Sequence, residues 1–172
     1  MRMTVAFTAA AIFLAVPAFA QPTSPVPPGL VPPGEEAVDP YPVSDANAGA
    51  TPVSGQELFA AFHGHEGISR IVDDMVEEVQ KDPRLTEIFK ASDFVRLRRT
   101  LKEQFCYILN GGCSYTGRDM KSVHADHGVT IAEFNALVEV LQVAMTREGV
   151  AFSAQNRLLA KLAPMKRETV TR

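Results

Sequence analysis

The chain has 172 residues, of which 46% are hydrophobic and 22% charged, and its formal net charge is −3. Nucleic-acid binding requires a basic footprint, and this chain has neither a surplus nor a cluster of lysine and arginine. We therefore expect no nucleic-acid partner. Ten of the twelve prolines fall between Pro17 and Pro52, which separates a proline-rich first third from a proline-poor remainder.

Residues 1–20 have the pattern of a secretory signal peptide. A positive charge at Arg2 precedes an apolar run over residues 5–16, and the segment closes with Ala18-Phe19-Ala20. This pattern predicts cleavage after Ala20 and export to the periplasm or the exterior. The apolar run is shorter than the roughly 20 residues that span a bilayer, so we expect no transmembrane segment in the mature chain.

Residues 21–54 are rich in proline, with glycine, serine and acidic residues between the prolines. Proline lacks an amide donor and disfavours helix in the residue before it, and so little apolar surface cannot offset the entropy lost on ordering. This composition predicts a disordered tether. A docking segment for a proline-binding partner is the alternative.

From residue 55 onward, apolar residues recur at helical spacing, and we expect one all-α domain over 55–167 with a short tail at 168–172. Ser54-x-x-Glu57 and Thr130-x-x-Glu133 have the form of capping boxes at helix starts. The expected helical segments are 57–62, 68–79, 94–109, a short piece at 120–124, 130–145 and 153–162. A domain of this size can bury a core of its own.

His124 lies among apolar residues, which fits either a core histidine or a metal ligand. The sequence contains no Cys-x-x-Cys-His for covalent haem attachment and no His-Glu-x-x-His for zinc. A more specific pattern is an ordered set of segments: His63-Gly-His-Glu-Gly-Ile68, Asp82-Pro-Arg-Leu85, Phe89, Gly111-Gly112, Tyr115-Thr-Gly-Arg-Asp-Met120, Val123-His124 and Gly128-Val-Thr130. Together these segments resemble a group I truncated haemoglobin over roughly residues 56–166.

The resemblance implies a two-over-two helical sandwich that binds one haem b and diatomic gases: oxygen, nitric oxide and carbon monoxide. His124 matches the proximal iron ligand, and imidazole suits iron. His127 is the rival ligand, and His65 matches a structural position in the glycine-containing turn. The remaining cofactor-binding positions implied by the resemblance are Val76, Phe89, Phe94, Leu97, Leu101, Phe105, Tyr115, Met120 and Val123.

The distal positions depart from the resemblance, because Val76, Leu97 and Leu101 stand where the family places hydrogen-bond donors to bound oxygen. Such a donor contributes roughly 1–3 kcal/mol, so its absence predicts weak oxygen retention or gas sensing. Met75 and Tyr107 are alternative sources of polarity or of a sixth ligand. We expect a ligand-binding haem protein rather than an enzyme. The alternatives are a haem-dependent oxidase or nitric oxide dioxygenase with an external reductase, and a haem-free helical interaction domain.

Cys106 and Cys113 are the two cysteines of the chain. On a continuous helix their Cα atoms would lie about 10.5 Å apart, beyond the roughly 7 Å that a disulfide can bridge. A turn at Gly111-Gly112 would fold Cys113 back toward Cys106. Because export leads to an oxidising compartment, a disulfide is the favoured interpretation, with two free thiols as the alternative.

Overall fold

The computed structural model describes residues 31–172, and these residues form helices without any strand. The predicted signal peptide and residues 21–30 of the predicted tether lie outside the described residues. The elements follow one another as η1 (Asp45–Ala48), α1 (Glu57–Ala61), α2 (Gly64–Val79), α3 (Thr86–Phe89), α4 (Phe94–Ile108), α5 (Met120–His124), α6 (Ile131–Arg147), α7 (Phe152–Leu162), η2 (Ala163–Met165) and α8 (Lys166–Thr169).

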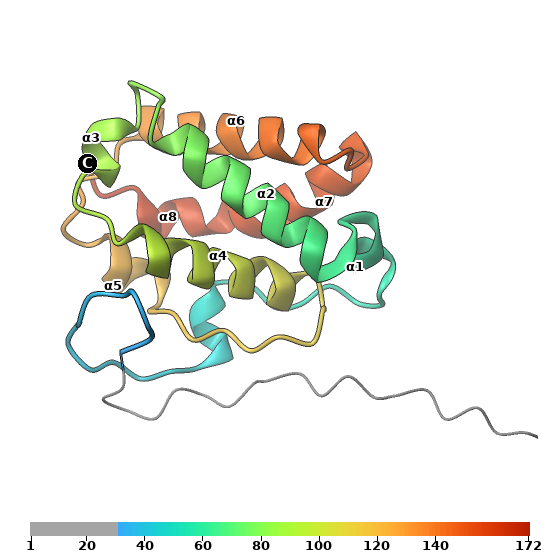
Figure 1. Ribbon diagram of the computed structural model, residues 1–172, viewed down its shortest axis with the longest axis horizontal. Coiled ribbons are helices and arrows are strands. Elements are labelled where there is room, and N and C mark those ends of the chain that lie inside the picture. Colours follow the sequence, from blue (N-terminus) through green and yellow to red (C-terminus); the bar gives the residue numbers. More distant parts are fainter. Residues whose placement is uncertain (1–30) are drawn as a thin grey trace, which may run out of the picture.

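Helix α2 is the centre of the packing. It contacts both α4 and α6, while α5 packs on α8 and α6 contacts α7 (Figure 1). The apolar stripe predicted for α2 is buried as expected, with Ile68, Ile71, Val72, Val76 and Val79 each at most 1% exposed. Full burial of one such side chain contributes about 1.5–3 kcal/mol, so this stripe is a main source of the stability of the fold.

One of the two predicted capping boxes is confirmed. Thr130 accepts a hydrogen bond from the Glu133 amide, and the Glu133 carboxylate accepts one from the Thr130 amide. The box predicted at Ser54 is wrong, because α1 begins at Glu57 after Gln56, which makes no side-chain cap. The chain turns at Gly55, whose φ of 74° separates Ser54 from the helix start.

The structure differs from the expectation of a disordered tether where it describes that stretch, residues 31–54, called here the N-terminal segment. Ala48 in η1 is fully buried, and the Gln104 amide of α4 donates to its carbonyl at 2.9 Å. The amide of Val53 donates to the Ile108 carbonyl at 2.8 Å. Proline removes amide donors but leaves carbonyls and acidic side chains as acceptors, so the domain can donate to this segment, as Gln104 does, in addition to accepting from its remaining amides.

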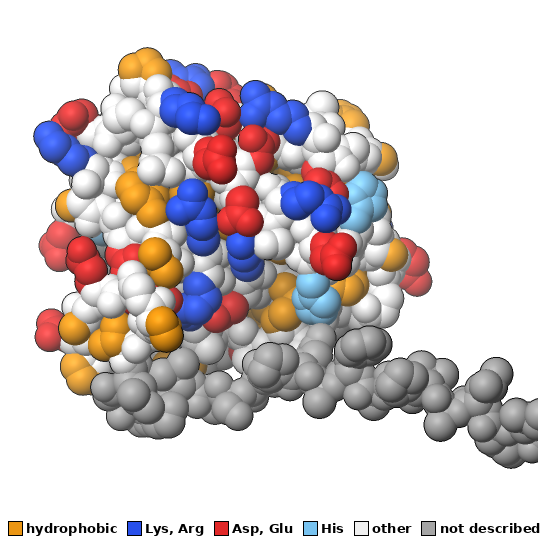
Figure 2. Space-filling view, in the orientation of Figure 1, with side chains coloured by type: hydrophobic (Ala, Val, Ile, Leu, Met, Phe, Trp, Pro, Cys, Tyr) orange, Lys and Arg blue, Asp and Glu red, His pale blue; other side chains and the backbone are white. Residues whose placement is uncertain are grey.

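The predicted tail at 168–172 is also part of the domain. Helix α8 runs through Thr169, and the amides of Thr171 and Arg172 both donate to the Val129 carbonyl, at 3.0 and 3.2 Å. Within residues 31–172, no helix is long and apolar enough to cross a bilayer. On the face shown in Figure 2, basic side chains alternate with acidic ones rather than forming a basic patch.

Candidate functional site

A largely apolar cavity of about 260 Å³ opens between α3, α4, α5 and α6, with the N-terminal segment along its side. Its apolar lining comprises Val38, Leu85, Ile88, Phe89, Ala91, Leu97, Val123, Val129, Phe134 and Leu137. Apolar atoms make up most of the lining surface, although residues with polar side chains are about as numerous and include two histidines, His124 and His127. An apolar cavity with a few convergent polar groups is the usual form of a cofactor site.

His124 is positioned by the short helix α5. The Asp119 carboxylate caps this helix by accepting the Ser122 amide at 2.9 Å. One turn along the helix, Nδ1 of His124 lies 2.7 Å from the Met120 carbonyl oxygen, which can only accept, so Nδ1 carries the proton and donates. Nε2 therefore holds a lone pair, and the ring lines the cavity.

The electrostatic surroundings of His124 also favour the neutral imidazole. Burial lowers its pKa, while the hydrogen bond to the Met120 carbonyl raises it in part. His127, the rival ligand, lines the same cavity with its ring centroid 6.2 Å from that of His124. His124, unlike His127, has its ring fixed by a bond to a helix carbonyl. This is the usual arrangement of a metal-binding histidine.

Four of the nine other predicted cofactor-binding residues line the cavity together with His124, namely Phe89, Leu97, Tyr115 and Val123. The other five are absent from the lining. Val76 and Phe105 are buried in the core, and Phe94 and Leu101 are half-buried against it. Met120 packs toward the buried Gln104 amide, whose nitrogen lies 3.6 Å from Sδ. A helical stripe predicts burial, but the arrangement of α3, α4, α5 and α6 around the cavity decides which side chains reach it.

The Tyr-Thr-Gly motif has a local structural explanation. Tyr115 lines the cavity, its hydroxyl donates to the Arg118 carbonyl at 3.1 Å, and burial raises the pKa of that hydroxyl. Its ring lies over Gly117, where an added Cβ would come within 2.2 Å of the hydroxyl oxygen. A side chain at 117 would therefore displace the tyrosine from the cavity wall. The Tyr115 amide is held by Asp45 of the N-terminal segment, at 2.7 Å.

Several cavity residues were not predicted from the sequence. Thr100 of α4 lines the cavity, and its hydroxyl donates to the Arg96 carbonyl at 2.9 Å. Tyr41 also lines it, donates to the Thr116 carbonyl at 2.9 Å and lies beneath the Arg118 guanidinium at 5.2 Å. Tyr41 belongs to the proline-rich segment that composition assigned to disorder, so no periodic pattern marked it.

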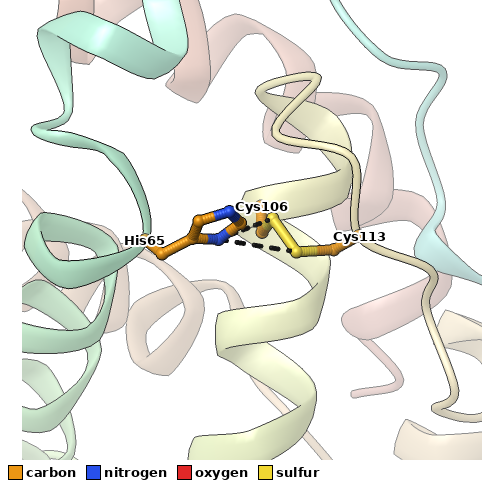
Figure 3. Close-up of side chains that lie close together, drawn as sticks. All are labelled: His65, Cys106 and Cys113. Carbon is orange, nitrogen blue, oxygen red and sulfur yellow. Dashed lines mark hydrogen bonds between the residues drawn. A yellow bond between two sulfur atoms is a disulfide. The ribbon is translucent and has the colours of Figure 1, made fainter. Parts of the chain in front are cut away.

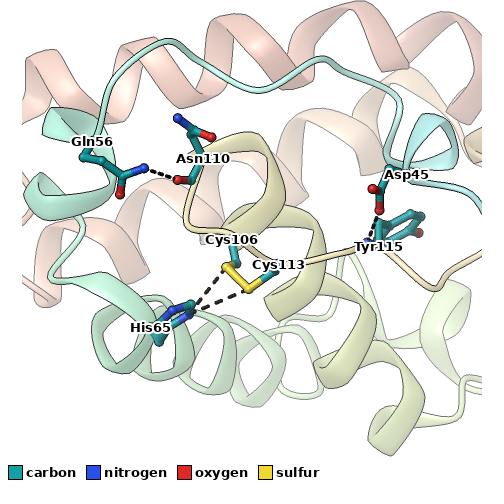
Figure 4. The surroundings of a disulfide bond; sticks show 7 residues. All are labelled: Asp45, Gln56, His65, Cys106, Asn110, Cys113 and Tyr115. Atoms are coloured by element: carbon teal, nitrogen blue, oxygen red, sulfur yellow. Dashed lines mark hydrogen bonds between the residues drawn. A yellow bond between two sulfur atoms is a disulfide. The ribbon is translucent and has the colours of Figure 1, made fainter. Parts of the chain in front are cut away.

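The two cysteines lie close together, with Cα atoms 5.7 Å apart, well within the span of a disulfide. Helix α4 ends at Ile108, and Asn110 adopts a left-handed conformation with φ of 62°, which turns the chain back. Gln56 donates to the Asn110 carbonyl at 2.6 Å and holds this turn in place (Figure 4). The turn thus begins at Asn110, before the predicted Gly111-Gly112, and it folds Cys113 back toward Cys106 as predicted.

The helical arrangement and the histidine in its apolar cavity define a globin of the two-over-two type. The chain belongs to the bacterial-like globin family, whose model matches residues 57–171. It is 32% identical over 114 residues to the group 1 truncated hemoglobin GlbN of Mycolicibacterium paratuberculosis, covering 66% of this chain and 84% of that protein. It is 28% identical over 116 residues to the group 1 truncated hemoglobin LI410 of Chlamydomonas moewusii, covering 66% and 67% of the two chains.

Solved structures show the same fold. The truncated hemoglobin of Tetrahymena pyriformis aligns with a TM-score of 0.64 at 18% identity, covering 67% of this chain and 98% of that one. The 2/2 hemoglobin of Synechococcus sp., solved in the cyanomet state with covalently attached heme, aligns with a TM-score of 0.61 at 19% identity and the same coverage. The predicted all-α, truncated-globin fold is therefore confirmed.

Proposed function

We propose that this protein binds one haem b in the cavity, with His124 as the proximal iron ligand, and that it binds diatomic gases there. The observation that carries the proposal is the Nδ1 bond from His124 to the Met120 carbonyl at 2.7 Å, which leaves Nε2 as the ligating atom of a cavity-lining ring. Membership of the globin family, with its truncated hemoglobin relatives, supports haem as the group that fills the cavity.

The residues present fit such a group. The lining is mainly apolar, which suits a porphyrin face, and Phe89 and Leu97 provide such surfaces. Arg96 and Arg118 also line the cavity and offer cationic partners for carboxylate groups. Haem, when bound, would supply an iron that His124 would hold through Nε2 and that could bind a gas. By donating from Nδ1, His124 keeps a fixed orientation and becomes a stronger ligand.

The chain's own residues favour weak oxygen retention. The three positions that the resemblance places beside the gas, Val76, Leu97 and Leu101, carry no hydrogen-bond donor, and of these Leu97 lines the cavity. Of the cavity hydroxyls, those of Thr100 and Tyr115 donate to backbone carbonyls instead. Oxygen depends on a donor more than carbon monoxide or nitric oxide does, so loose gas binding or gas sensing is the role that these residues support.

The proposal includes export after cleavage at Ala20 and a disulfide between Cys106 and Cys113. The Cα separation of 5.7 Å supports the disulfide, and an oxidising compartment would maintain it. Intact-mass measurement of protein from the bacterial periplasm, with and without reductant, tests both parts. Loss of residues 1–20 and a gain of two mass units on reduction are expected. Two thiols in the unreduced material would contradict the disulfide.

Haem binding is tested by reconstitution with haemin and absorption spectroscopy. Wild-type protein should show an intense Soret band with one haem per chain, and His124→Ala should lose or strongly shift it. His127→Ala is the matched control, because it removes a histidine of the same cavity and should leave the spectrum nearly unchanged. A wild-type spectrum in His124→Ala, or loss confined to His127→Ala, would refute His124 as the ligand.

Ligand kinetics test the proposed weak retention of oxygen. Oxygen should leave the ferrous protein ten- to a hundredfold faster than it leaves a relative with a distal tyrosine, since a missing bond of about 1.4–2.8 kcal/mol has that effect on a rate. Slow oxygen release would refute the weak-retention argument. Sustained nitric oxide consumption with an external reductase would identify an enzyme instead of a binding protein.

A further inference from the structure

A second cluster of metal-binding side chains lies away from the haem cavity and shares no residue with its lining. It comprises His65 in the first turn of α2, Cys106 near the end of α4 and Cys113 in the loop that leads toward α5 (Figure 3). Nδ1 of His65 lies 3.4 Å from Sγ of Cys106 and 3.7 Å from Sγ of Cys113. The start of α2 thus directs one nitrogen to the two sulfurs at the end of α4 and in the following loop, 41 and 48 positions further along the chain.

These separations match the geometry of a tetrahedral metal centre. With metal–sulfur bonds of about 2.3 Å and metal–nitrogen bonds of about 2.05 Å, the nitrogen and a sulfur of one centre lie about 3.6 Å apart. In the structure the two sulfurs are joined as a disulfide, and the distances from His65 Nδ1 to them in this state, 3.4 and 3.7 Å, bracket this value. Two thiolates of such a centre lie about 3.8 Å apart, which the Cα separation of 5.7 Å accommodates by side-chain rotation.

We propose that, when the disulfide is reduced, His65, Cys106 and Cys113 bind one thiophilic d¹⁰ cation, either Zn²⁺ or Cu⁺. A dithiol reductant would transfer two electrons and two protons to the disulfide and become a disulfide itself, leaving two thiols on this chain. Binding of the cation then releases both thiol protons, and each sulfur forms a bond to the metal. Soft thiolate ligands with one imidazole select these two ions among the common metals.

The surroundings of the cluster suit a metal site that forms when the disulfide is reduced and is lost when it is oxidised. Cys106 is 2% exposed, whereas His65 is exposed, so one side of the cluster is dry and the other is open to a water molecule as fourth ligand. The Phe59 ring meets the edge of His65 at 4.9 Å between centroids. Gly111 permits this close approach, because a Cβ there would lie 2.4 Å from Phe59 and 2.8 Å from the Cys106 sulfur.

The test measures metal stoichiometry in haem-loaded protein, so that His124 is engaged and iron reports the haem content independently. Protein reduced with a phosphine is dialysed against Zn²⁺ or, without oxygen, against Cu⁺, and an oxidised sample is treated with Zn²⁺ in the same way. Elemental analysis then gives metal per iron. X-ray absorption at the zinc or copper edge identifies the ligand atoms.

Reduced protein should bind one Zn²⁺ or Cu⁺ per chain through two sulfurs, and oxidised protein should bind none at this site. His65→Gln, at an exposed position, should weaken binding at least tenfold while the helical circular dichroism stays unchanged. His63→Asn is the matched control: it removes a histidine two residues away, and asparagine tolerates the left-handed φ of 58° found there. Equal binding by oxidised and reduced protein, wild-type binding by His65→Gln, or no sulfur ligands would overturn the proposal.

Discussion

Replacing Glu35 with glutamine should release the N-terminal segment from α4. The Glu35 side chain is only 1% exposed, and its carboxylate accepts hydrogen bonds from the guanidinium groups of Arg96 and Arg99. Both bonds to Oε2 measure 3.0 Å, and the arginines lower the pKa of Glu35. Glutamine keeps the size of the side chain and removes the charge, so it isolates the electrostatic part of the contact.

The free energy lost in Glu35→Gln can be estimated from these contacts. A hydrogen bond to a charged group contributes about 1.5–3 kcal/mol when it is shielded from water. The full penalty for a stranded charge does not apply, because Arg96 keeps Asp93 at 3.7 Å and Arg99 keeps Glu103 at 2.9 Å. We therefore expect a loss of about 2 kcal/mol, which raises the open population of the segment about 30-fold.

Two measurements check this expectation. Hydrogen exchange of the Glu36 amide, which donates to Asp93 at 2.8 Å, should quicken about 30-fold in Glu35→Gln. Because Val38 and Tyr41 line the cavity, transfer of haem to an apoglobin acceptor should quicken as well, by up to the same factor. Glu36→Gln is the matched control, since Glu36 is exposed and contacts its neighbours through its backbone.

The stabilisation by Glu35 should depend on pH, and the direction of that dependence follows from its lowered pKa. The pKa of Glu35 is lowered in the folded protein, so its contribution is present above the ordinary value of 4.5 and is lost as pH falls through the lowered value. Wild type and Glu35→Gln should therefore converge in acid. Unchanged amide exchange in Glu35→Gln at neutral pH, or equal effects of Glu35→Gln and Glu36→Gln, would refute the reasoning.

Three further predictions concern an ion pair at the surface and the cavity. Glu148→Gln should lower the free energy of unfolding at neutral pH by about 1 kcal/mol in denaturant titrations, because Arg70 is half-exposed and the pair is partly screened; the pKa of Glu148 is lowered to about 2, so this difference should fade as pH falls from 4.5 toward 2. Leu97→Gln should slow oxygen release about tenfold, because Leu97 lines the cavity and glutamine there adds a hydrogen-bond donor; an unchanged rate in stopped-flow measurements would contradict the distal placement of Leu97. Gly117→Ala should lower the melting temperature and shift the Soret band, because Tyr115 must move from the cavity wall; full retention of both would contradict the role assigned to Gly117.

Much of the candidate site was accessible from local patterns in the sequence. His124, Phe89 and Tyr115 were predicted because their short motifs resemble those of group I truncated haemoglobins, and the geometry of such a motif is set within a few residues, as in the bond from His124 back to Met120 in the same helix. Positions on the long helices were harder to predict. Leu97 lines the cavity and Leu101 does not, although both belong to one apolar stripe of α4. The lining residues from α4 all lie between Arg96 and Thr100, and no periodicity in the sequence distinguishes that part of the helix.

The N-terminal segment shows the opposite case, in which composition gave the wrong expectation. Prolines and acidic residues predict a chain that cannot fold by itself, and these residues indeed form only one short 3₁₀ helix. The segment is nevertheless ordered from outside. Glu35 binds arginines more than 60 positions away, and Asp45 accepts the Tyr115 amide. Such long-range partners leave no trace in local composition.

The sequence by itself determined the helical class, the order of the helices and the histidine at the centre of the proposed haem site, because helix periodicity, caps and short motifs act over a few residues. Tertiary structure decided which side chains line the cavity and brought Tyr41 into it. Tertiary structure also placed His65 beside the two cysteines. These features depend on distances between elements remote in sequence, and such distances are fixed only when α2, α4 and the N-terminal segment pack together.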